Sequence, residues 1–485
     1  MGFDSEEYDV CIIGSGPNGL AAASVLANSG LSVIVLEASD TIGGGLRTKE
    51  LTLPGFLHDV CSAAHPMGIL SPYLKTLPLK EHGLEWIEPE ASVAHPLDGE
   101  AAVLLKLSLE ETAENLGKDK KSYIKLLSPF LKNPEGLLKD ALAPLGIPDH
   151  PFLLARFGLL GLRPAKSIAN SYFKEERAKA LFAGCAGHSI FPLEKLLSGA
   201  LGLLFSLTGH VRSWPVVKGG SQMIAKSMES YLKTLGVKIK TNYKVSNLSQ
   251  LPKVRAIVFD TSPDQLGSVA GNTLSSSYIN RISSYNYGPG VFKMDWALDG
   301  PIPWKDPRCL EASTVHVGGT LAEISRSESD VWKGKHSDKP YMLVVQQSQF
   351  DPTRAPKGKH TGYAYCHVPS RSTKDLTEIL ENQIERFAPG FKDRILAKHS
   401  MNTSDFYKYN LNYIGGAITG GAADLPQAFL RPIAKINPYT TPNPHIFLCS
   451  ASTPPGGGVH GMCGYYAAKT ILKKINSLKA VQYSK

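Results

Sequence analysis

The glycine motif near the start of the chain constrains the fold more than any other feature. Residues 8–45 read YDVCIIGSGPNGLAAASVLANSGLSVIVLEASDTIGGG, in which two apolar runs flank Gly14-Ser-Gly16-Pro-Asn-Gly19 and an Ala-rich helical pattern. In a strand–turn–helix unit the first glycine permits a tight turn, the second lets backbone approach a pyrophosphate, and the third lets the helix pack on the strand. This order predicts a Rossmann-like dinucleotide site. The expected contacts are Gly14, Ser15, Gly16, Pro17, Asn18 and Gly19.

The residues after the second apolar run narrow the choice of dinucleotide. Glu37 ends that run, where a carboxylate can accept both ribose hydroxyls, and Ala38 follows it. NAD and the adenosine half of FAD would suit Glu37 equally well. A second glycine cluster, 43–45, precedes Arg47-Thr48 and lets backbone follow a longer cofactor, although a glycine-rich surface turn with a solvated arginine is the alternative. The expected contacts in this stretch are Gly44, Gly45, Leu46 and Arg47.

A second strand–glycine loop–helix pattern near the end of the chain favours FAD over NAD. Residues 446–475 read IFLCSASTPPGGGVHGMCGYYAAKTILKKI. A helix N-terminus placed beside a flavin ring would favour negative charge on the reduced cofactor. A plain turn before a docking helix is the simpler alternative, but it does not need three glycines and a histidine. The expected contacts are Ser452, Gly458, Val459 and His460.

Together with PGFLHDVCSAAHP (54–66), ALFAGCAGHSIFPLEK (180–195), WPVVKGGSQ (214–222) and YGPGVFKMDWALDGPIPW (287–304), these motifs carry a family resemblance. The chain resembles the FAD-dependent phytoene desaturase and flavin amine oxidase superfamily, and within it the phytoene dehydrogenase-related oxidoreductases. It departs from the family pattern at two positions. Gly45 stands where the superfamily has an arginine after its paired glycines, and Cys61 replaces the glycine of a GF-x-x-D-x-G pattern.

The resemblance implies an α/β fold and FAD as the cofactor. It implies a Rossmann-like FAD-binding domain split over residues 1–70, 211–274 and 416–485, with Val245 near the adenine. The substrate domain would be α+β, with an antiparallel sheet in 275–415 and a mainly helical insertion in 71–210. In the sheet part, the sequence predicts strands at 291–298, 342–346 and 362–368 and an amphipathic helix that ends before Pro389.

Candidate catalytic residues are few, because the flavin itself carries the redox chemistry. Flavin amine oxidases place a lysine before a Phe-Trp at a spacing close to that between Lys293 and Trp304, so the resemblance gives Lys293 a catalytic role. A solvent-facing lysine at a strand edge is the alternative. His460, together with His58 and His65, is a candidate acid or base. We expect His188 to be structural, and no histidine spacing predicts a metal site. 

Composition excludes several other classes of function. The seven cysteines contain no CxxC pair, so a dithiol relay to the flavin is not expected. No second glycine fingerprint provides for bound NAD(P)H. The net charge of +9 is spread along the chain, which argues against nucleic-acid binding. The acidic residues 1–10 do not resemble a signal peptide, so a cytoplasmic location is expected.

Two strongly apolar segments, 152–162 and 196–207, are candidates for a peripheral membrane contact or for the mouth of a tunnel that admits an apolar substrate. The alternative is that both are buried helices of a bundle. The sequence therefore predicts an FAD-dependent oxidoreductase that moves hydride or electrons between its flavin and a small apolar, polyene-like or amine substrate. Oxygen, a quinone or another acceptor would reoxidise the flavin. The alternative is a flavin-binding interaction protein with a mainly structural cofactor. The oligomeric state, the substrate and the direction of reaction stay open.

Overall fold

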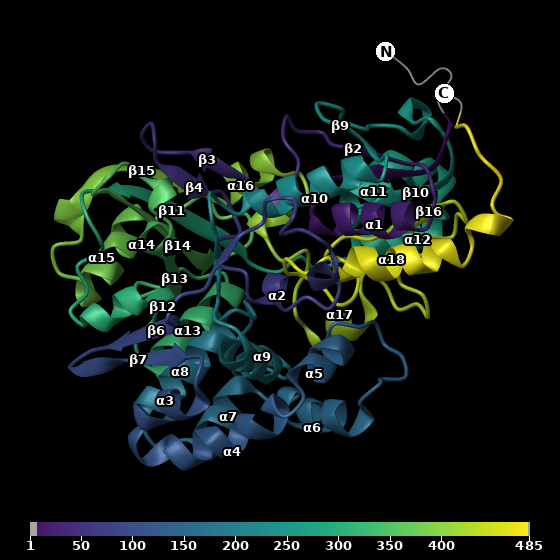
Figure 1. Cartoon of the computed structure of the whole chain (residues 1–485). Coiled ribbons are helices and arrows are strands. Elements are labelled where there is room, and N and C mark those ends of the chain that lie inside the picture. The colour runs from purple at the N-terminus through teal and green to yellow at the C-terminus, as the bar shows by residue number, and fades with distance from the viewer. Residues whose placement is uncertain (1–6, 484–485) are drawn as a thin grey trace.

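The computed structural model describes residues 7–483, and Figure 1 shows two lobes built around two sheets. Residues 1–6, which carry part of the argument against a signal peptide, lie outside the described residues. The first sheet is parallel throughout. Its order is β9 (Lys238–Lys240), β2 (Val33–Leu36), β1 (Glu7–Ile13), β10 (Lys253–Phe259) and β16 (Ile446–Leu448). The α/β fold class predicted from the glycine motif is confirmed.

Helices cover both faces of this parallel sheet, because successive residues of β1 point to opposite sides. Val10 and Ile12 pack in one apolar cluster with α1 and α18, whereas Cys11 and Ile13 pack in another with α11 and α12. The helices of this lobe are α1 (Pro17–Asn28), α10 (Gln222–Thr234), α11 (Pro263–Ala270), α12 (Ser276–Ser283) and α18 (Met462–Leu472).

The second sheet is mixed and forms the core of the other lobe. Its order is β15 (Ile395–Met401), β11 (Gly290–Leu298), β14 (His360–Val368), β13 (Met342–Val345), β12 (Ala312–Val317), β6 (Ala91–Leu97) and β7 (Glu100–Lys106). Neighbouring strands are antiparallel except β12 and β6, which pair parallel. The strands predicted in 275–415 are therefore present. 

The segment 71–210 is less purely helical than predicted, because β6 and β7 extend the second sheet. The Asp98-Gly99 pair between them is a hairpin signal that the sequence reading overlooked. The short helix α2 (Pro66–Ile69) lies just before the segment. The helices of the segment are α3 (Leu109–Glu114), α4 (Lys120–Leu131), α5 (Pro134–Ala141), α6 (Pro151–Gly161), α7 (Ala165–Tyr172), α8 (Glu176–Gly187) and α9 (Ser198–Val211).

The two apolar segments, 152–162 and 196–207, differ in how far they are buried. Residues 196–207 fall largely in α9, which packs against α8 and is mostly buried, as expected for a bundle helix. Residues 152–162 form α6, which leaves Phe152 90% and Leu159 74% exposed. None of the helices in residues 7–483 combines the length and apolar character that crossing a bilayer requires.

The remaining elements cover the second sheet or connect the lobes. The amphipathic helix expected before Pro389 is α15, and it packs in one apolar cluster with β11–β14. The elements that cover the second sheet or connect the lobes are β3 (Thr48–Glu50), β4 (Leu57–Asp59), β5 (Trp86–Ile87), β8 (Val216–Val217), α13 (Leu321–Trp332), α14 (Gln347–Phe350), α15 (Thr377–Phe387), α16 (Thr403–Tyr409) and α17 (Leu425–Leu430).

Candidate active site

A cavity of about 630 Å³ lies between the two lobes. One part of it, which we call the nucleotide end, is lined by the turn before α1, by Glu37 and by Val245. The opposite part, which we call the sheet end, is lined by His188 just after α8 and by side chains of α9 and the second sheet. Residues of the sheet end include His188, Phe205, Trp214, Thr314, Tyr363 and Tyr365.

The N-terminus of α1 opens on the nucleotide end, and its N-cap residue has no side chain that could cap it. Gly16 is its N-cap, Pro17 is the first helical residue, and the first turn carries no acidic residue. The free N–H groups and the positive end of the helix dipole suit a pyrophosphate. Asn18 lines the cavity with its Oδ1 buried and without a partner among the described residues. This cradle therefore has the shape and the unsatisfied polar groups that a dinucleotide would use.

Gly14 and Gly19 have the structural reasons expected for them, a tight turn and close helix packing, whereas Gly16 lies against Asp260 and its contact with a pyrophosphate stays a prediction. Gly14 has φ +101°, and a Cβ there would lie 2.7 Å from the Asp260 carbonyl oxygen. A Cβ on Gly16 would lie 2.6 Å from a carboxylate oxygen of Asp260. A Cβ on Gly19 would overlap the carbonyl oxygen of Gly14, so glycine is required for α1 to pack this close to β1.

Glu37 is buried at the end of β2 and already holds the neighbouring loops together. Its carboxylate accepts hydrogen bonds from the Ser15 N–H at 3.0 Å and hydroxyl at 2.5 Å, and from the Ser39 N–H at 2.9 Å. Arg47 donates to it at 3.2 Å and also to the carbonyl oxygen of Thr41. Glu37 and Arg47 both line the cavity, but their bonds to each other show that they also fix its wall.

Most of the predicted cofactor contacts line this one cavity, although they come from three distant parts of the sequence. The two arms of the cofactor motif, Gly14–Asn18 and 44–47, meet there with the C-terminal loop. Gly19 instead serves the packing of α1. Further predicted residues that line the cavity are Glu37, Ala38, Val245, Ser452, Gly458 and Val459. Their contacts with a cofactor stay predictions.

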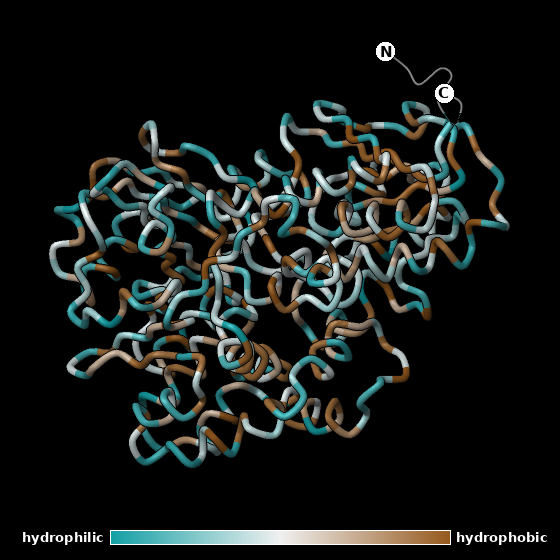
Figure 2. The backbone as a smooth tube through the Cα atoms, in the orientation of Figure 1, coloured by the Kyte–Doolittle hydropathy of each residue, from teal (hydrophilic) through white to brown (hydrophobic). Residues whose placement is uncertain are grey.

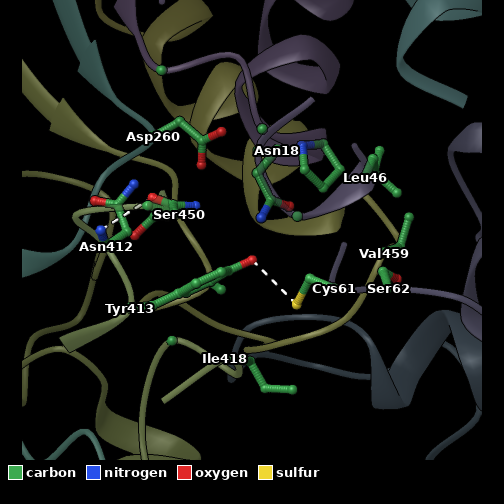
Figure 3. Close-up of a pocket in the computed structure, with 18 of the residues that line it drawn as sticks. Asn18, Leu46, Cys61, Ser62, Asp260, Asn412, Tyr413, Ile418, Ser450 and Val459 are labelled. Carbon is green, nitrogen blue, oxygen red and sulfur yellow. Dashed lines mark hydrogen bonds between the residues drawn. The ribbon is translucent and has the colours of Figure 1, made fainter. Parts of the chain in front are cut away.

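Asp260 is a residue of the nucleotide end that the sequence reading missed. It follows β10, and its carboxylate accepts the Gly19 N–H at 2.8 Å. Figure 3 shows Asp260 and Asn18 directed into the same space. Burial raises the pKa of Asp260 to about 7, opposed by the hydrogen bond from Gly19, and the nearby charge of Glu37 raises it further. The position of Asp260 directly after a parallel strand was the signal that could have identified it, since ligands bind at the carboxyl ends of parallel strands.

We expect Asp260 to make cofactor affinity depend on pH. Because its folded pKa of about 7 lies above the ordinary 3.8, the folded protein holds an extra proton between these values, and the stability of the cofactor-free protein falls as pH rises through that window. Above it, the ionised carboxylate repels a pyrophosphate on α1, so we expect dinucleotide affinity to fall about tenfold between about pH 6 and about pH 8. Asp260→Asn should bind with a flat profile in fluorescence titrations. An unchanged slope in the variant would exclude Asp260 as the cause.

The predicted catalytic lysine does not reach the cavity. Lys293 lies on β11 as predicted, but it is wholly buried and paired with Asp295, which shares its face of the strand. Its Nζ lies 4.5 Å from the centre of the Tyr363 ring, and Tyr363 lines the cavity in its place. The structure thus corrects both alternatives, because Lys293 faces neither the cavity nor solvent.

Of the predicted histidines His460, His58 and His65, only His65 lines the cavity. His460 is buried outside the cavity lining, where its Nδ1 accepts the N–H of Met462 at 3.0 Å and so supports the start of α18. This geometry gives it a structural role rather than the expected catalytic one. His58 is turned away and bonds Thr52, whereas His65 lines the cavity and shares a hydrogen bond of 2.8 Å with Ser221.

Cys61, at the position where the family pattern has a glycine, lines the middle of the cavity. Figure 3 shows the hydroxyl of Tyr413 directed at its sulfur, 3.5 Å away. The carbonyl oxygen of Cys61 accepts from the hydroxyl of Tyr363. Burial raises the pKa of the Cys61 thiol, so it stays protonated and acts as a small apolar group in the wall.

The sheet end contains the functional side chains that the sequence reading missed most completely. His188, expected to be structural, lines the cavity with Phe205 and Trp214 around it. Tyr363 and Tyr365 alternate along β14, so both point to the cavity face of the sheet. That alternation in GYAYCHV was readable, but which face would meet the cavity was not.

Comparison with known proteins agrees with this geometry. A family model described as flavin containing amine oxidoreductase matches residues 18–269, more than half of the chain. Pyridine nucleotide-disulfide oxidoreductase domain-containing protein 2 of Rattus norvegicus is 25% identical, over 97% of this chain and 94% of its own. The 4,4'-diapophytoene desaturase (4,4'-diaponeurosporene-forming) of Staphylococcus haemolyticus is 21% identical, over 93% and 95%. Wild-type putrescine oxidase bound to putrescine shares the fold, with a TM-score of 0.61 and 17% identity over 96% and 99% of the chains.

Proposed function

We propose, because the chain belongs to the flavin-containing amine oxidoreductase family, that it is an FAD-dependent oxidoreductase acting on an uncharged, mainly apolar substrate. Hydride would pass between that substrate and the flavin, and oxygen, a quinone or another acceptor would reoxidise the flavin. One observation carries the choice of substrate, namely the chemistry of the sheet end of the cavity.

The sheet end is aromatic and aliphatic and carries no negative charge. Among the described residues that line the cavity, the carboxylates are Glu37 and Asp260, and both lie at the nucleotide end. A cationic substrate at the sheet end would lose its hydration without an acidic partner, which is costly. An apolar substrate would instead gain from burial against Phe205, Trp214 and Leu343.

The residues present fit FAD, whose bound flavin supplies the two-electron chemistry. The α1 N-terminus, whose N-cap residue is a glycine, and the unpartnered Oδ1 of Asn18 suit the pyrophosphate, and Glu37 lies where a ribose is expected. Gly458 and Val459 approach the middle of the cavity from the C-terminal loop. The chain's own residues would therefore hold the cofactor.

One relative supports the same choice of substrate. The name of the diapophytoene desaturase describes action on an unsaturated hydrocarbon, and its match covers 93% of this chain. 

The test is anaerobic reduction of the bound flavin. Holoenzyme would be mixed with isoprenoid polyenes in detergent, or with benzylamine and putrescine, while absorbance near the flavin maximum is followed. We expect the polyenes to react and the amines not to react. Reduction by amines alone would overturn the proposal. Two results together would favour an interaction role. Neither class of compound would reduce the flavin, and flavin reduced with dithionite would not pass its electrons to oxygen or quinones.

Amine oxidation is a second candidate, supported by one specific observation. Tyr363 and Tyr365 both line the sheet end, with ring centroids 6.1 Å apart and ring planes at 83°. Aromatic ring faces attract cations, so this pair could hold an amine without a carboxylate. The same anaerobic experiment separates the two candidates.

A membrane surface is the proposed source of the substrate. The loop before α6 exposes Ile147 completely, and α6 adds the exposed Phe152 and Leu159. Figure 2 shows hydrophobic colouring over this loop at the lower right edge of the molecule. Residues 150–174 contain four basic side chains and no acidic one, which suits an anionic lipid surface.

Removing the exposed apolar side chains should weaken binding to lipid. We expect Phe152→Ser/Leu159→Ser to lower partitioning to anionic vesicles about tenfold or more, because each inserted side chain contributes on the order of 1 kcal/mol. Flotation at low salt measures this. Leu396→Ser, at an exposed apolar residue of β15, is the matched control and should not change flotation. Wild-type protein that stays entirely out of the lipid fraction would exclude the membrane contact.

A further inference from the structure

Two histidines from different segments of the second lobe meet nitrogen to nitrogen beside the sheet end of the cavity. Nε2 of His188, after α8, lies 3.0 Å from Nε2 of His316 on β12. His188 stacks on Phe205 with ring centroids 4.5 Å apart and meets the edge of Trp214 at 5.2 Å. The imidazole is therefore held in one orientation, with its opposite nitrogen, Nδ1, left without a protein partner among the described residues.

The surroundings of His316 decide which histidine donates the shared hydrogen. Burial lowers the pKa of His188 to about 3 and lowers that of His316 well below its ordinary value, so both rings are neutral. Nδ1 of His316 is buried without a partner. A buried N–H without an acceptor costs more than an unused lone pair, so the proton of His316 belongs on Nε2. His316 then donates to His188, and His188 carries its own proton on Nδ1.

His188 is the histidine of this pair that lines the cavity, so its Nδ1–H gives the cavity wall a neutral hydrogen-bond donor. A second polar group stands near it in the fold, because Thr314 and His316 share one face of β12. The Thr314 hydroxyl is buried, lines the cavity, and has no hydrogen-bond partner among the described residues. A hydroxyl without a partner in an otherwise apolar wall indicates a ligand group that completes it.

We propose that His188 and Thr314 form a subsite that binds a neutral oxygen, a carbonyl or a hydroxyl, of an otherwise apolar substrate. This inference rests on the proposed function and adds a polar anchor to it. His316 is the positioning residue that sets the proton on the cavity side of His188. The anchor accounts for polar groups that a purely hydrocarbon substrate would leave unsatisfied.

The test uses three probes with the same ring skeleton: indane, 1-indanone and 1-aminoindane. Each is titrated into flavin-loaded protein, and binding is read from the perturbed flavin spectrum and not from turnover. We expect 1-indanone to bind about 3- to 10-fold more tightly than indane, as one or two hydrogen bonds allow. The cationic 1-aminoindane should bind most weakly.

Three variants assign the preference to the subsite. His188→Leu and Thr314→Val should each bring the ratio of the 1-indanone affinity to the indane affinity, measured in the same variant, to within about twofold of one. His188→Asn should retain the preference, because its amide N–H can occupy the position of Nδ1. The flavin spectrum of each free variant confirms that it folds.

The outcomes separate this inference from the proposed function. Equal binding of indane and 1-indanone to the wild type, or a preference that survives both His188→Leu and Thr314→Val, overturns the subsite alone. Tightest binding of 1-aminoindane, with bleaching of the flavin, overturns the uncharged substrate and the subsite together.

Discussion

Replacing Gly464 by alanine is expected to abolish FAD binding and to lower the free energy of unfolding by about 3 kcal/mol or more. Gly464 lies in the first turn of α18, where that helix crosses α1. A Cβ there would overlap the carbonyl oxygen of Asn18 and approach the backbone nitrogen of Ala22 to 3.0 Å. Neither contact can be relieved by turning a side chain, because both atoms belong to the backbone of α1. The helix whose N-terminus forms the pyrophosphate cradle would have to move.

Gly158→Ala is the matched control, since Gly158 is also helical and a Cβ there meets nothing within 4 Å. That substitution should stabilise the protein by about 0.5–1 kcal/mol through helix propensity. Denaturant unfolding measures the stabilities, and absorbance of the purified protein measures bound flavin. Full flavin content in Gly464→Ala would show that α18 does not position the cradle.

The nucleotide end of the cavity could be predicted because its sequence motif is local. Gly14, Gly16 and Gly19 lie within six residues, so their spacing is a local signal for the turn and the helix, although Gly14 and Gly16 also lie against Asp260. Asp260 enters the same turn only through the pairing of β1 with β10, which joins residues far apart in the chain. Nothing in the local sequence says that its carboxylate meets the Gly19 N–H.

The sheet end was harder to predict, because its chemistry depends on which residues face each other across the lobes. The strand that holds Lys293 was predicted correctly, and the orientation of that lysine is decided by Asp295 on the same strand face. His188 follows a helix of small residues, which in isolation indicates close packing. Its position in the cavity depends on His316 and Trp214, and both lie in other segments.

Removing Arg354 is expected to cost about 3–5 kcal/mol of folding free energy, because it leaves a buried carboxylate without its counter-charge. Arg354 and Asp59 are both fully buried, with 2.8 Å between guanidinium and carboxylate. Arg354 also bonds Asp351 at 3.1 Å and the carbonyl oxygen of Leu57 at 3.2 Å. It therefore ties β4, next to the cofactor motif, to the segment after α14 in the other lobe. Arg354→Met keeps the length of the side chain and removes the charge.

The exposed pair of Lys359 and Asp299 provides the control, and Lys359→Met should change stability by less than about 1 kcal/mol. The double variant Arg354→Met/Asp59→Asn should lose less than the sum of its single substitutions, because no buried charge then stands unpaired. Additive losses in urea unfolding would show that the pair is not coupled.

The pH dependence of Arg354→Met supplies an independent check. Burial alone would raise the pKa of Asp59, but the charge and hydrogen bonds of Arg354 hold it below its ordinary 3.8. In the wild type this stabilisation is present above about pH 4 and is lost as pH falls through the folded pKa. In the variant burial is opposed only by the remaining hydrogen bonds, among them those from the Ser221 N–H and the Thr48 hydroxyl, so Asp59 takes up a proton at higher pH and the cost of its buried charge declines on acidification. The stability gap between the two proteins should therefore be widest near neutral pH and narrow toward pH 4, whereas a constant gap would mean that Arg354 acts through packing rather than through charge.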